Sequence, residues 1–330
     1  MRGWLRFVLL SSIILSFVSF SIVGYQLYLL FTKPMAGGKP VIVSINKNTS
    51  ASAFVHTLKS KHLIESPRLF LAFIRAKGLA PQLKAGIYEA LPGETAIQFL
   101  EKVVTGNVLV ESFSIIEGTT LSQVKANLIS AQYLKYDVND WLVIRTQNSN
   151  LEGLLLADTY HYDAGSDAKH LLLLANQNLL QYLDDCWKNR TPGLPYKSSY
   201  ELLIAASILE KESSIPEERK LISGVVANRL KKNMPLQMDP TVIYALGPNY
   251  HGKLSHNDMA VASPYNTYRY RGLPPGPIAM VGKDAIDAAA HPQATDYLYF
   301  VAKGDGSHHF SVTYEEQKKA ISRYRNKGPS

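Results

Sequence analysis

The chain has 330 residues, of which 46% are hydrophobic and 19% are charged, and its formal net charge is +8. This length allows about two modest domains, and the composition excludes a disordered or low-complexity chain. The positive charge permits an anionic partner, but the basic residues are scattered and no zinc-finger or RNA-binding motif accompanies them, so we expect no nucleic-acid partner. The single cysteine, Cys186, cannot form an intrachain disulfide.

The N-terminal segment is strongly apolar. Residues 7–31 carry no charge, and a helix of roughly 25 residues crosses a hydrocarbon core of about 30 Å. Arg2 and Arg6 precede this run, which favours a cytoplasmic location for residues 1–6. The alternative is a cleaved signal peptide, but the run is longer than a signal-peptide core and no A-x-A cleavage site follows it. We therefore predict an uncleaved single-pass anchor at 7–31, with the rest of the chain outside the cytoplasm.

Residues 32–39 have the composition of a short linker, and residues 40–110 are expected to form a compact module. Alternating apolar residues predict strands in this module, and apolar residues at helical spacing predict helices. Ser66 and Pro67 are typical of a helix start, and Gly78 is typical of the residue after a helix end. The predicted elements are strands at 40–45 and 85–90 and helices at 50–61, 66–78 and 95–106. The module has no candidate nucleophile beside a base, so we expect a binding or spacing role.

The second predicted part of the chain begins at residue 111. Residues 111–195, including 151–162, are expected to be mostly helical, and a long apolar helix and a second helix follow them. The next segment is rich in Gly, Pro, Tyr and Asn, is too aromatic for disorder, and is typical of a functional loop. A hairpin around Gly304–Gly306 and a helix from Tyr314 are expected at the end of the chain. This mixture predicts an α+β fold.

Two glutamates, Glu210 and Glu212, lie at the end of the long apolar helix. On a helical wheel of about 100° per residue, Glu212 lies within roughly 50° of the apolar centre, whereas Glu210 lies more than about 100° away and suits a surface or supporting role. The apolar centre consists of Leu202, Ala205, Ala206 and Leu209. Ser214 and Glu217 have the spacing of a capping box for the next helix, so Glu212 is expected at a helix–helix junction. A carboxyl there is desolvated and its pKa is raised, as a general acid requires, although a hydrogen-bonded structural acid fits the same pattern.

Aromatic and amide residues at 265–268 form a second candidate site. Their flat apolar faces and hydrogen-bonding groups suit sugar rings, but a packed hairpin corner has the same composition; the residues are Tyr265, Asn266, Thr267 and Tyr268. Gln237 and Asp239 are either cleft residues or turn formers. A zinc hydrolase is a further alternative, but no H-E-x-x-H pattern is present, so structural or exposed roles are favoured for the histidines considered: His251, His256, His291, His308 and His309.

Several motifs, taken in order, resemble those of the endolytic murein transglycosylases of the MltG (YceG-like) family. They are "LEGLLLADTY" at 151–160, "ASILEKES" at 206–213, "ERKLISGVVANRL" at 218–230, "LQMDPTVIYALG" at 236–247, "SPYNTYRYRGLPPGPI" at 263–278 and "AAAHP…YLYFVA" at 288–302. The resemblance implies that Glu212 is the catalytic acid. Substrate binding is expected of Gln237, Asp239, Tyr265, Asn266, Thr267, Tyr268, Glu152, Asp158 and Tyr160, and supporting roles of Glu210, Ser213 and Asn228. The family commonly has Phe-Pro-Asp-Thr-Tyr where this chain has "LADTY" at 156–160, and the missing proline bears on the local turn.

The resemblance also implies a reaction and a location. Family members cut the β-1,4 bond between N-acetylmuramic acid and N-acetylglucosamine in glycan strands without water and leave 1,6-anhydro ends, and Glu212 would act first as acid and then as base. The implied protein sits in the bacterial inner membrane, with a LysM-like module at 40–110 and a periplasmic catalytic domain at 111–330. Its expected partners are peptidoglycan strands and the membrane, together with peptidoglycan synthases if it ends the elongation of nascent strands, and it uses no metal or cofactor.

Two alternatives to this reaction stay open. A water-using muramidase acts on the same substrate and requires a second carboxyl roughly 5–9.5 Å from Glu212. A non-catalytic cell-wall-binding adaptor shares the anchor, the small module and the basic charge. The environment of Glu212 distinguishes these readings.

Overall fold

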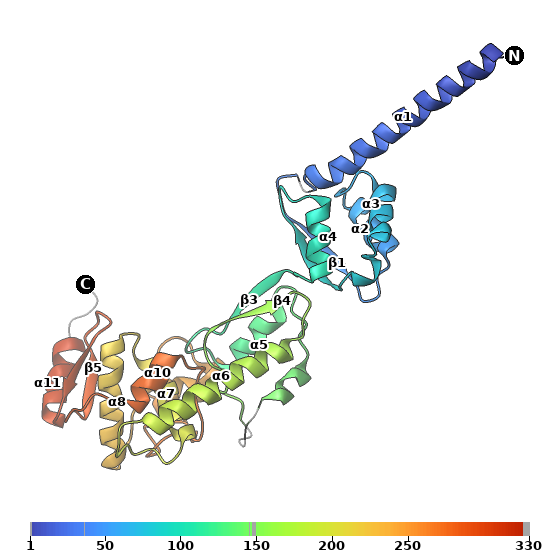
Figure 1. Cartoon of the computed structure of the whole chain (residues 1–330). Helices are drawn as coiled ribbons and strands as arrows, with labels where there is room; N and C mark the ends of the chain where they lie inside the picture. The colour runs from blue at the N-terminus through green and yellow to red at the C-terminus, as the bar shows by residue number, and fades with distance from the viewer. Residues whose placement is uncertain (1, 36, 145, 147–149, 326–330) are drawn as a thin grey trace. The chain divides into compact units, whose positions relative to one another are not determined.

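The computed structural model describes residues 2–35, 37–144, 146 and 150–325 (Figure 1). Met1 of the predicted cytoplasmic segment, Ala36 of the predicted linker, and residues 145, 147–149 and 326–330 lie outside the described part. The chain falls into two compact units: residues 1–111 with 163–166, and residues 112–162 with 167–330. Both units combine helices with short paired strands, so the predicted α+β class is confirmed.

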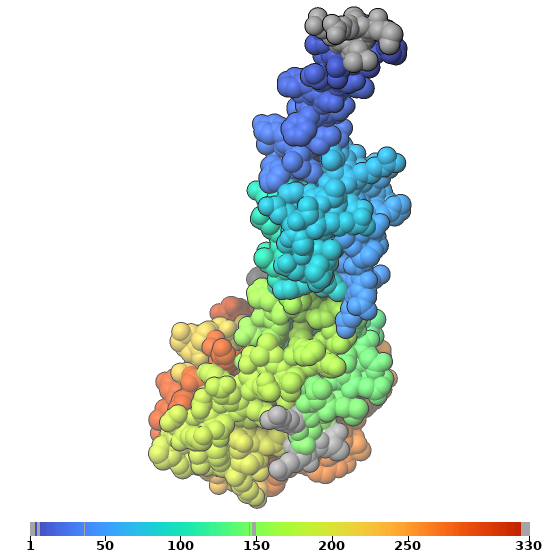
Figure 2. All heavy atoms as spheres, turned by 45° about the vertical axis from the view of Figure 1, so that its right-hand side comes forward, coloured from blue at the N-terminus to red at the C-terminus, as the bar shows by residue number. Residues whose placement is uncertain are grey.

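Helix α1 (Arg2–Thr32) begins the first unit. Its segment Phe7–Thr32 is long and apolar enough to cross a membrane, by length and composition. Large apolar side chains along it, among them Phe17 and Phe20, are exposed. Figure 2 draws the atoms of this helix in dark blue. A helix whose apolar side chains lack protein neighbours suits a lipid environment. This finding is consistent with the predicted single-pass anchor, and its orientation stays a prediction.

A two-stranded sheet covered by helices follows α1. Strand β1 (Val41–Ile45) pairs antiparallel with β2 (Gly86–Ala90). The helical elements of this part are α2 (Ala51–Ser60), α3 (Pro67–Ala76), η1 (Ala80–Gln82) and α4 (Ala96–Thr105). Phe54, Phe70, Tyr88 and Phe99 are fully buried between them. The strands and helices predicted at 40–106 are present, whereas the likeness to a LysM module stays a prediction.

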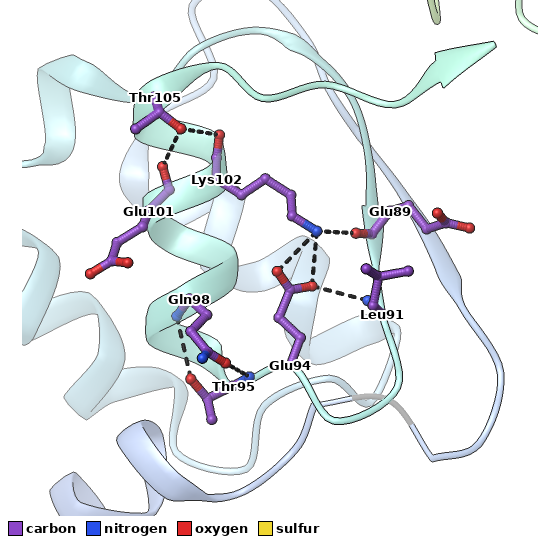
Figure 3. A network of polar contacts seen from close by, with 8 residues as sticks. All are labelled: Glu89, Leu91, Glu94, Thr95, Gln98, Glu101, Lys102 and Thr105. Carbon is purple, nitrogen blue, oxygen red and sulfur yellow. Dashed lines mark hydrogen bonds and ion pairs between the residues drawn. The ribbon is translucent and has the colours of Figure 1, made fainter.

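A polar network fixes α4 against the turn that precedes it (Figure 3). Thr95 and Gln98 form a capping box, in which each side chain accepts the backbone N–H of the other residue. Lys102 Nζ donates to the Glu89 carbonyl oxygen at 2.8 Å and pairs with Glu94 Oε1 at 2.9 Å. Because Lys102 and Glu94 are largely shielded from water, this pair is screened less than an exposed one. We assign the network a structural role.

Helix α7 (Ser199–Glu212) is the core helix of the second unit, and its residues 202–209 are all buried. The helices that pack against it are α6 (Ala168–Asn189), α8 (Pro216–Lys231), α9 (Asp239–Leu246) and α10 (Lys283–Ala290). A helix buried on all sides is held in position by its neighbours. The core therefore fixes the orientation of α7 up to its last residue, Glu212.

Residues 111–195 contain strands that the sequence did not predict. Strand β3 (Val110–Ser114) pairs with β4 (Thr159–Asp163), and α5 (Leu121–Ser130) and η2 (Val138–Val143) lie between them in the sequence. In β4, Tyr160 and Tyr162 are buried and their neighbours are exposed. This period of two is the strand signal, and the apolar run just before it obscured the signal. The prediction of a mostly helical region, including 151–162, is therefore wrong.

The C-terminal elements agree with the sequence prediction. Strand β5 (Tyr299–Ala302) pairs antiparallel with β6 (His308–Ser311), and α11 (Tyr314–Arg325) follows. The long segment between α9 and α10 contains two short helical turns, η3 (Gly247–Asn249) and η4 (Asp258–Ala260). The hairpin around Gly304–Gly306 and the helix from Tyr314 are confirmed.

Candidate active site

The predicted catalytic residue, Glu212, is the last residue of α7, and Arg219 of α8 holds the turn that follows it. Arg219 Nε donates to the Ser213 carbonyl oxygen at 3.0 Å, and Arg219 Nη2 pairs with Glu210 Oε1 at 3.2 Å. The other Glu210 oxygen accepts the Gly282 N–H at 2.8 Å. The Glu210 side chain is only 2% exposed, so of the two roles predicted for it, surface or supporting, the surface role is wrong. Glu210 and Ser213 instead support the junction that carries Glu212.

Ser213, rather than Ser214, organises the start of α8. The helix begins at Pro216, and Ile215 is its N-cap residue without a side-chain cap. Ser213 Oγ accepts the Ile215 N–H at 3.1 Å. The predicted capping box of Ser214 and Glu217 is wrong, because α8 starts one residue later than that spacing requires.

The carboxyl of Glu212 is desolvated. Its Oε1 atom is buried and has no hydrogen-bond partner among the described residues. Burial raises the pKa of Glu212 to about 8, the neighbouring Asp239 carboxylate adds to this rise, and the Arg229 guanidinium opposes it. Glu212 is therefore mostly protonated at neutral pH, which is the state that a general acid needs.

Arg229, which the sequence did not single out, brings a positive charge close to Glu212. It is buried on α8. Its Nε donates to the Leu298 carbonyl oxygen and its Nη1 to the Leu236 carbonyl oxygen, both at 2.6 Å. These bonds fix the guanidinium and tie two distant segments to α8. A sequence signal for it exists, because Arg229 lies seven residues after Ile222, on the buried stripe of the helix.

Asp239 and Tyr268, both predicted to bind substrate, lie close to the Glu212 carboxyl. Gln237, also predicted to bind substrate, contacts Arg229. The Tyr268 hydroxyl donates to Asp239 Oδ1 at 2.5 Å, and burial together with this carboxylate and that of Glu212 raises the pKa of Tyr268. Gln237 Oε1 accepts from Arg229 Nη1 at 3.4 Å. Gln237 has a φ of 53°, an uncommon value for a residue other than glycine. The structure thus places Asp239 and Tyr268 close to Glu212, and Gln237 beside Arg229.

Asn266 and Thr267 hold the loop rather than extend from it. The Asn266 amide donates to the Met259 and Val261 carbonyl oxygens, both at 3.0 Å, and its own oxygen accepts the Tyr268 N–H. Thr267 is buried, and its Oγ1 accepts the Met238 N–H at 3.0 Å. Both side chains are therefore engaged in positioning Tyr268.

A pocket of about 630 Å³ adjoins this group, and Glu152 forms part of its lining. Glu152 is buried, and its two oxygens accept the Leu121 N–H at 2.7 Å and the Tyr244 hydroxyl at 3.2 Å. The Tyr265 ring lies against that of Tyr244 with centroids 4.8 Å apart, and the Tyr265 hydroxyl accepts from the Asn150 amide at 3.1 Å. Glu152 thus lines this pocket, and Tyr265 contacts two of its lining residues, Tyr244 and Asn150.

The sequence of this chain is similar to those of known proteins. The sequence matches the YceG-like family over residues 43–323. The chain belongs to this family. An endolytic murein transglycosylase of Bacillus subtilis is 32% identical to it over 86% of this chain and 84% of that protein. One from Streptococcus pneumoniae is 28% identical over 92% of this chain, which spans 62% of that relative's length.

A solved structure agrees with this assignment. The crystal structure of a YceG-like protein from Listeria monocytogenes is 32% identical in sequence, with a TM-score of 0.53, and the match covers 86% of this chain and 99% of that one. The curated relatives are lytic transglycosylases by name. The resemblance inferred from the motifs, and with it the enzyme class of the family, is confirmed.

Asp158 and Tyr160 of the "LADTY" motif have local contacts. Asp158 is exposed and its Oδ1 accepts the next residue's N–H at 2.7 Å. Tyr160 is buried and donates to the Leu156 carbonyl oxygen at 2.9 Å. Their predicted role in substrate binding stays a prediction. Ala157, at the position where YceG-like proteins commonly have proline, donates its N–H to the Val281 carbonyl oxygen at 2.8 Å, a bond that proline cannot make.

Asn228, predicted to support the site, connects α8 to the segment before β5. Its amide donates to the Thr295 and Tyr297 carbonyl oxygens at 2.7 and 3.1 Å. In the first turn of the same helix, Glu218 Oε2 contacts His308 Nδ1 at 2.7 Å. Among the described residues, no three histidine, cysteine or acidic side chains are grouped as metal ligands. The zinc-hydrolase alternative therefore has no geometric support in that part of the chain.

Proposed function

We propose that this chain is a membrane-anchored endolytic transglycosylase that cuts the β-1,4 bond between N-acetylmuramic acid and N-acetylglucosamine within peptidoglycan strands. The observation that carries the proposal is the buried Oε1 of Glu212 and the pKa of about 8 that accompanies it. An acid that is protonated at neutral pH is what protonation of a leaving oxygen requires. The names of the Bacillus and Streptococcus relatives support the same substrate.

Glu212 serves both halves of the proposed reaction. It first donates its proton to the glycosidic oxygen while the bond from that oxygen to C1 of the muramic acid breaks. The C6 hydroxyl of the same muramic acid then attacks C1, and the Glu212 carboxylate takes the hydroxyl proton. The acid is restored, the strand ends in a 1,6-anhydro sugar, and no water is consumed. Acid–base catalysis of this kind contributes about 10²–10⁴-fold to the rate.

The groups around Glu212 suit both of its protonation states. Arg229 lowers the pKa of Glu212 and so stabilises the carboxylate that exists between the two proton transfers. Asp239 acts in the opposite direction and favours the acid. Tyr268 and Gln237 offer polar groups for sugar hydroxyl and acetamido substituents, because sugars are held by such groups beside flat rings.

Membrane attachment is the second part of the proposal. We place α1 across the bacterial inner membrane, with residues 1–6 in the cytoplasm and the catalytic domain in the periplasm; the length and apolar character of α1 support this. The module at 40–110 then acts as a LysM-like glycan-binding spacer. An enzyme held at this surface meets nascent strands, so we propose that it ends their elongation beside peptidoglycan synthases.

A water-using muramidase is the second candidate, and Asp239 is the observation that favours it. A hydrolase needs another carboxyl within roughly 5–9.5 Å of the acid, and Asp239 lies close enough to Glu212 to raise its pKa. The hydrogen bond from Tyr268 occupies one oxygen of Asp239 and leaves the other for a water. The two candidates differ in the chemical nature of the new strand end.

Mass spectrometry of purified glycan strands decides between these candidates. The full-length chain in detergent is compared with its Glu212→Gln variant on the same strands. We expect 1,6-anhydromuramyl ends from the unmodified chain and none above background from the variant. Reducing ends would overturn the proposal in favour of the muramidase, and equal cutting by both proteins would remove Glu212 from the chemistry.

A further inference from the structure

The pocket beside α7 is a feature that the proposed reaction does not use. It measures about 630 Å³ and is lined by the start of α5, residues 150 and 152, Lys211 of α7, and the region from α9 to η3. Glu212 is not among its described lining residues. This volume lies within the range of about 300–1,000 Å³ that is typical of sites for ligands larger than a single functional group.

Two lysines line this pocket from different helices, Lys125 on α5 and Lys211 on α7. Lys211 Nζ donates to the Gly118 carbonyl oxygen at 3.1 Å, and Lys125 Nζ lies 5.3 Å from the Trp141 ring centroid. An ammonium group has three N–H donors, so these contacts leave each lysine with donors for a ligand. The pocket therefore offers two cations to a ligand that carries a carboxylate.

The acid in the described lining, Glu152, does not balance these lysines fully. It is one carboxyl beside two lysines, and both of its oxygens already accept hydrogen bonds from the protein; burial raises its pKa and the Lys125 charge opposes this rise. Apolar and aromatic groups, including Ile243, Tyr244 and Pro248, supply other parts of the wall. A wall of this kind, with two cations beside it, suits a short acidic peptide better than a neutral sugar.

The pocket adjoins the reaction centre at two points. Lys211 immediately precedes Glu212 on α7, and Pro240 of the lining immediately follows Asp239. Successive residues of a helix point about 100° apart, so Lys211 and Glu212 face different sides of α7. A group bound in the pocket is thus close to the bond being cut without being part of that bond.

We propose that this pocket binds the peptide stem that branches from the lactyl group of the glycan strand, with Lys125 and Lys211 receiving a stem carboxylate. The inference rests on the proposed function, because it assumes that glycan strands are the substrate. It names a preference within that substrate: strands that keep their stems are cut in preference to strands whose stems have been removed. The pocket volume exceeds what the lactyl carboxylate alone would fill.

The test compares two substrates and two variants of the full-length chain in detergent. The substrates are uncrosslinked strands with intact stems and the same strands after an amidase has removed the stems, which leaves the free lactyl carboxylate. The first variant, Lys125→Met with Lys211→Met, removes both charges at similar side-chain length. The matched control is Lys231→Met, an exposed lysine of α8 that does not line this pocket. The readout is kcat/KM for new ends on each substrate.

We expect the unmodified chain and the Lys231 control to favour stem-bearing strands, and we expect the double variant to lose about tenfold of that preference, mainly through KM. Equal loss on both substrates would overturn the proposal and make the pocket a subsite for the glycan itself. A wild-type chain that cuts both substrates equally would overturn it as well.

A binding measurement separates this inference from the proposed reaction. Isothermal titration of both substrates into the Glu212→Gln variant reports stem recognition even if no strand is ever cut. We expect tighter binding of stem-bearing strands and a loss of that difference when Lys125 and Lys211 are replaced as well. Cutting without a stem-dependent difference in binding would refute the pocket assignment alone, whereas binding without cutting would refute the reaction alone.

Discussion

Replacing Glu212 by glutamine tests the buried acid for chemistry and for stability together. The folded chain holds the Glu212 proton more tightly than the unfolded chain, because burial raises the pKa from its ordinary 4.5 to about 8. The unfolded state therefore loses its proton first, and the stability of the folded state falls as pH rises between these values. Glutamine does not ionise and escapes this loss. It also has no proton to donate, so cutting should fall by about 10²–10⁴-fold.

The size of the stability gain follows from these two pKa values. One pKa unit corresponds to about 1.36 kcal/mol, so the penalty on the folded state at about pH 7 is about 3 kcal/mol. Water penetration and local relaxation reduce this, and we expect a gain of about 1–3 kcal/mol. At about 2–4 °C per kcal/mol, the Tm of Glu212→Gln should exceed that of the parent by about 2–12 °C. At about pH 5 the gain should shrink below about 1 kcal/mol.

Calorimetry of the full-length chain in detergent at about pH 5 and about pH 8 measures this difference. Glu217→Gln is the matched control. Glu217 is an exposed carboxylate in the first turn of α8, where its charge interacts favourably with the helix dipole, so its loss should cost at most about 1 kcal/mol. The two substitutions should therefore change the Tm at alkaline pH in opposite directions. A Tm difference for Glu212→Gln that is negative at alkaline pH, or independent of pH, would refute the reasoning.

Three further predictions concern the same unit. Cutting should decline above about pH 8 because only protonated Glu212 donates, and Asp239→Asn should move this decline to lower pH while cutting at about pH 6 persists; loss at every pH would favour the muramidase. Arg219→Met breaks a buried ion pair and should lower stability by about 3–5 kcal/mol, measured by denaturant titration, where an unchanged midpoint would contradict the assigned role. Gly224→Ala places a Cβ 2.5 Å from the Gln293 carbonyl oxygen and should lower the free energy of unfolding by about 1–3 kcal/mol, with an unaltered Tm as the contrary result.

Local sequence patterns were sufficient for most elements of the first unit. Pro67 begins α3, and Gly78, just past its end, has a φ of 66° that glycine adopts without strain. Such constraints act within a few residues and can be recognised without knowing the tertiary fold. The same approach failed at β4, because only Tyr160 and Tyr162 carry its alternation and a long apolar run precedes them. A short strand whose partner, β3, is distant in the sequence has too weak a local signal.

The burial of the Glu212 carboxyl was predictable from the sequence, and the groups around it were predictable only in part. Helical periodicity gave the direction of Glu212, because the orientation of a side chain on α7 follows from its apolar neighbours. The family motifs supplied Asp239 and Tyr268, which do lie beside it. Arg229 was missed because a basic residue on a helix usually faces water, and only tertiary packing against the Leu298 segment buries it.

The charges beside Glu212 suit the proposed reaction, in which this carboxyl acts first as an acid and then as a base. Burial and the Asp239 charge raise the pKa of Glu212, which favours the protonated acid before the reaction. The Arg229 charge lowers this pKa, which stabilises the carboxylate after the first proton transfer. Hydrogen bonds hold both charges in place: Arg229 donates to backbone carbonyl oxygens, and the Tyr268 hydroxyl donates to Asp239. Burial, together with these two opposing charges, leaves the pKa of Glu212 at about 8, a value that suits both the loss and the return of a proton in the proposed reaction.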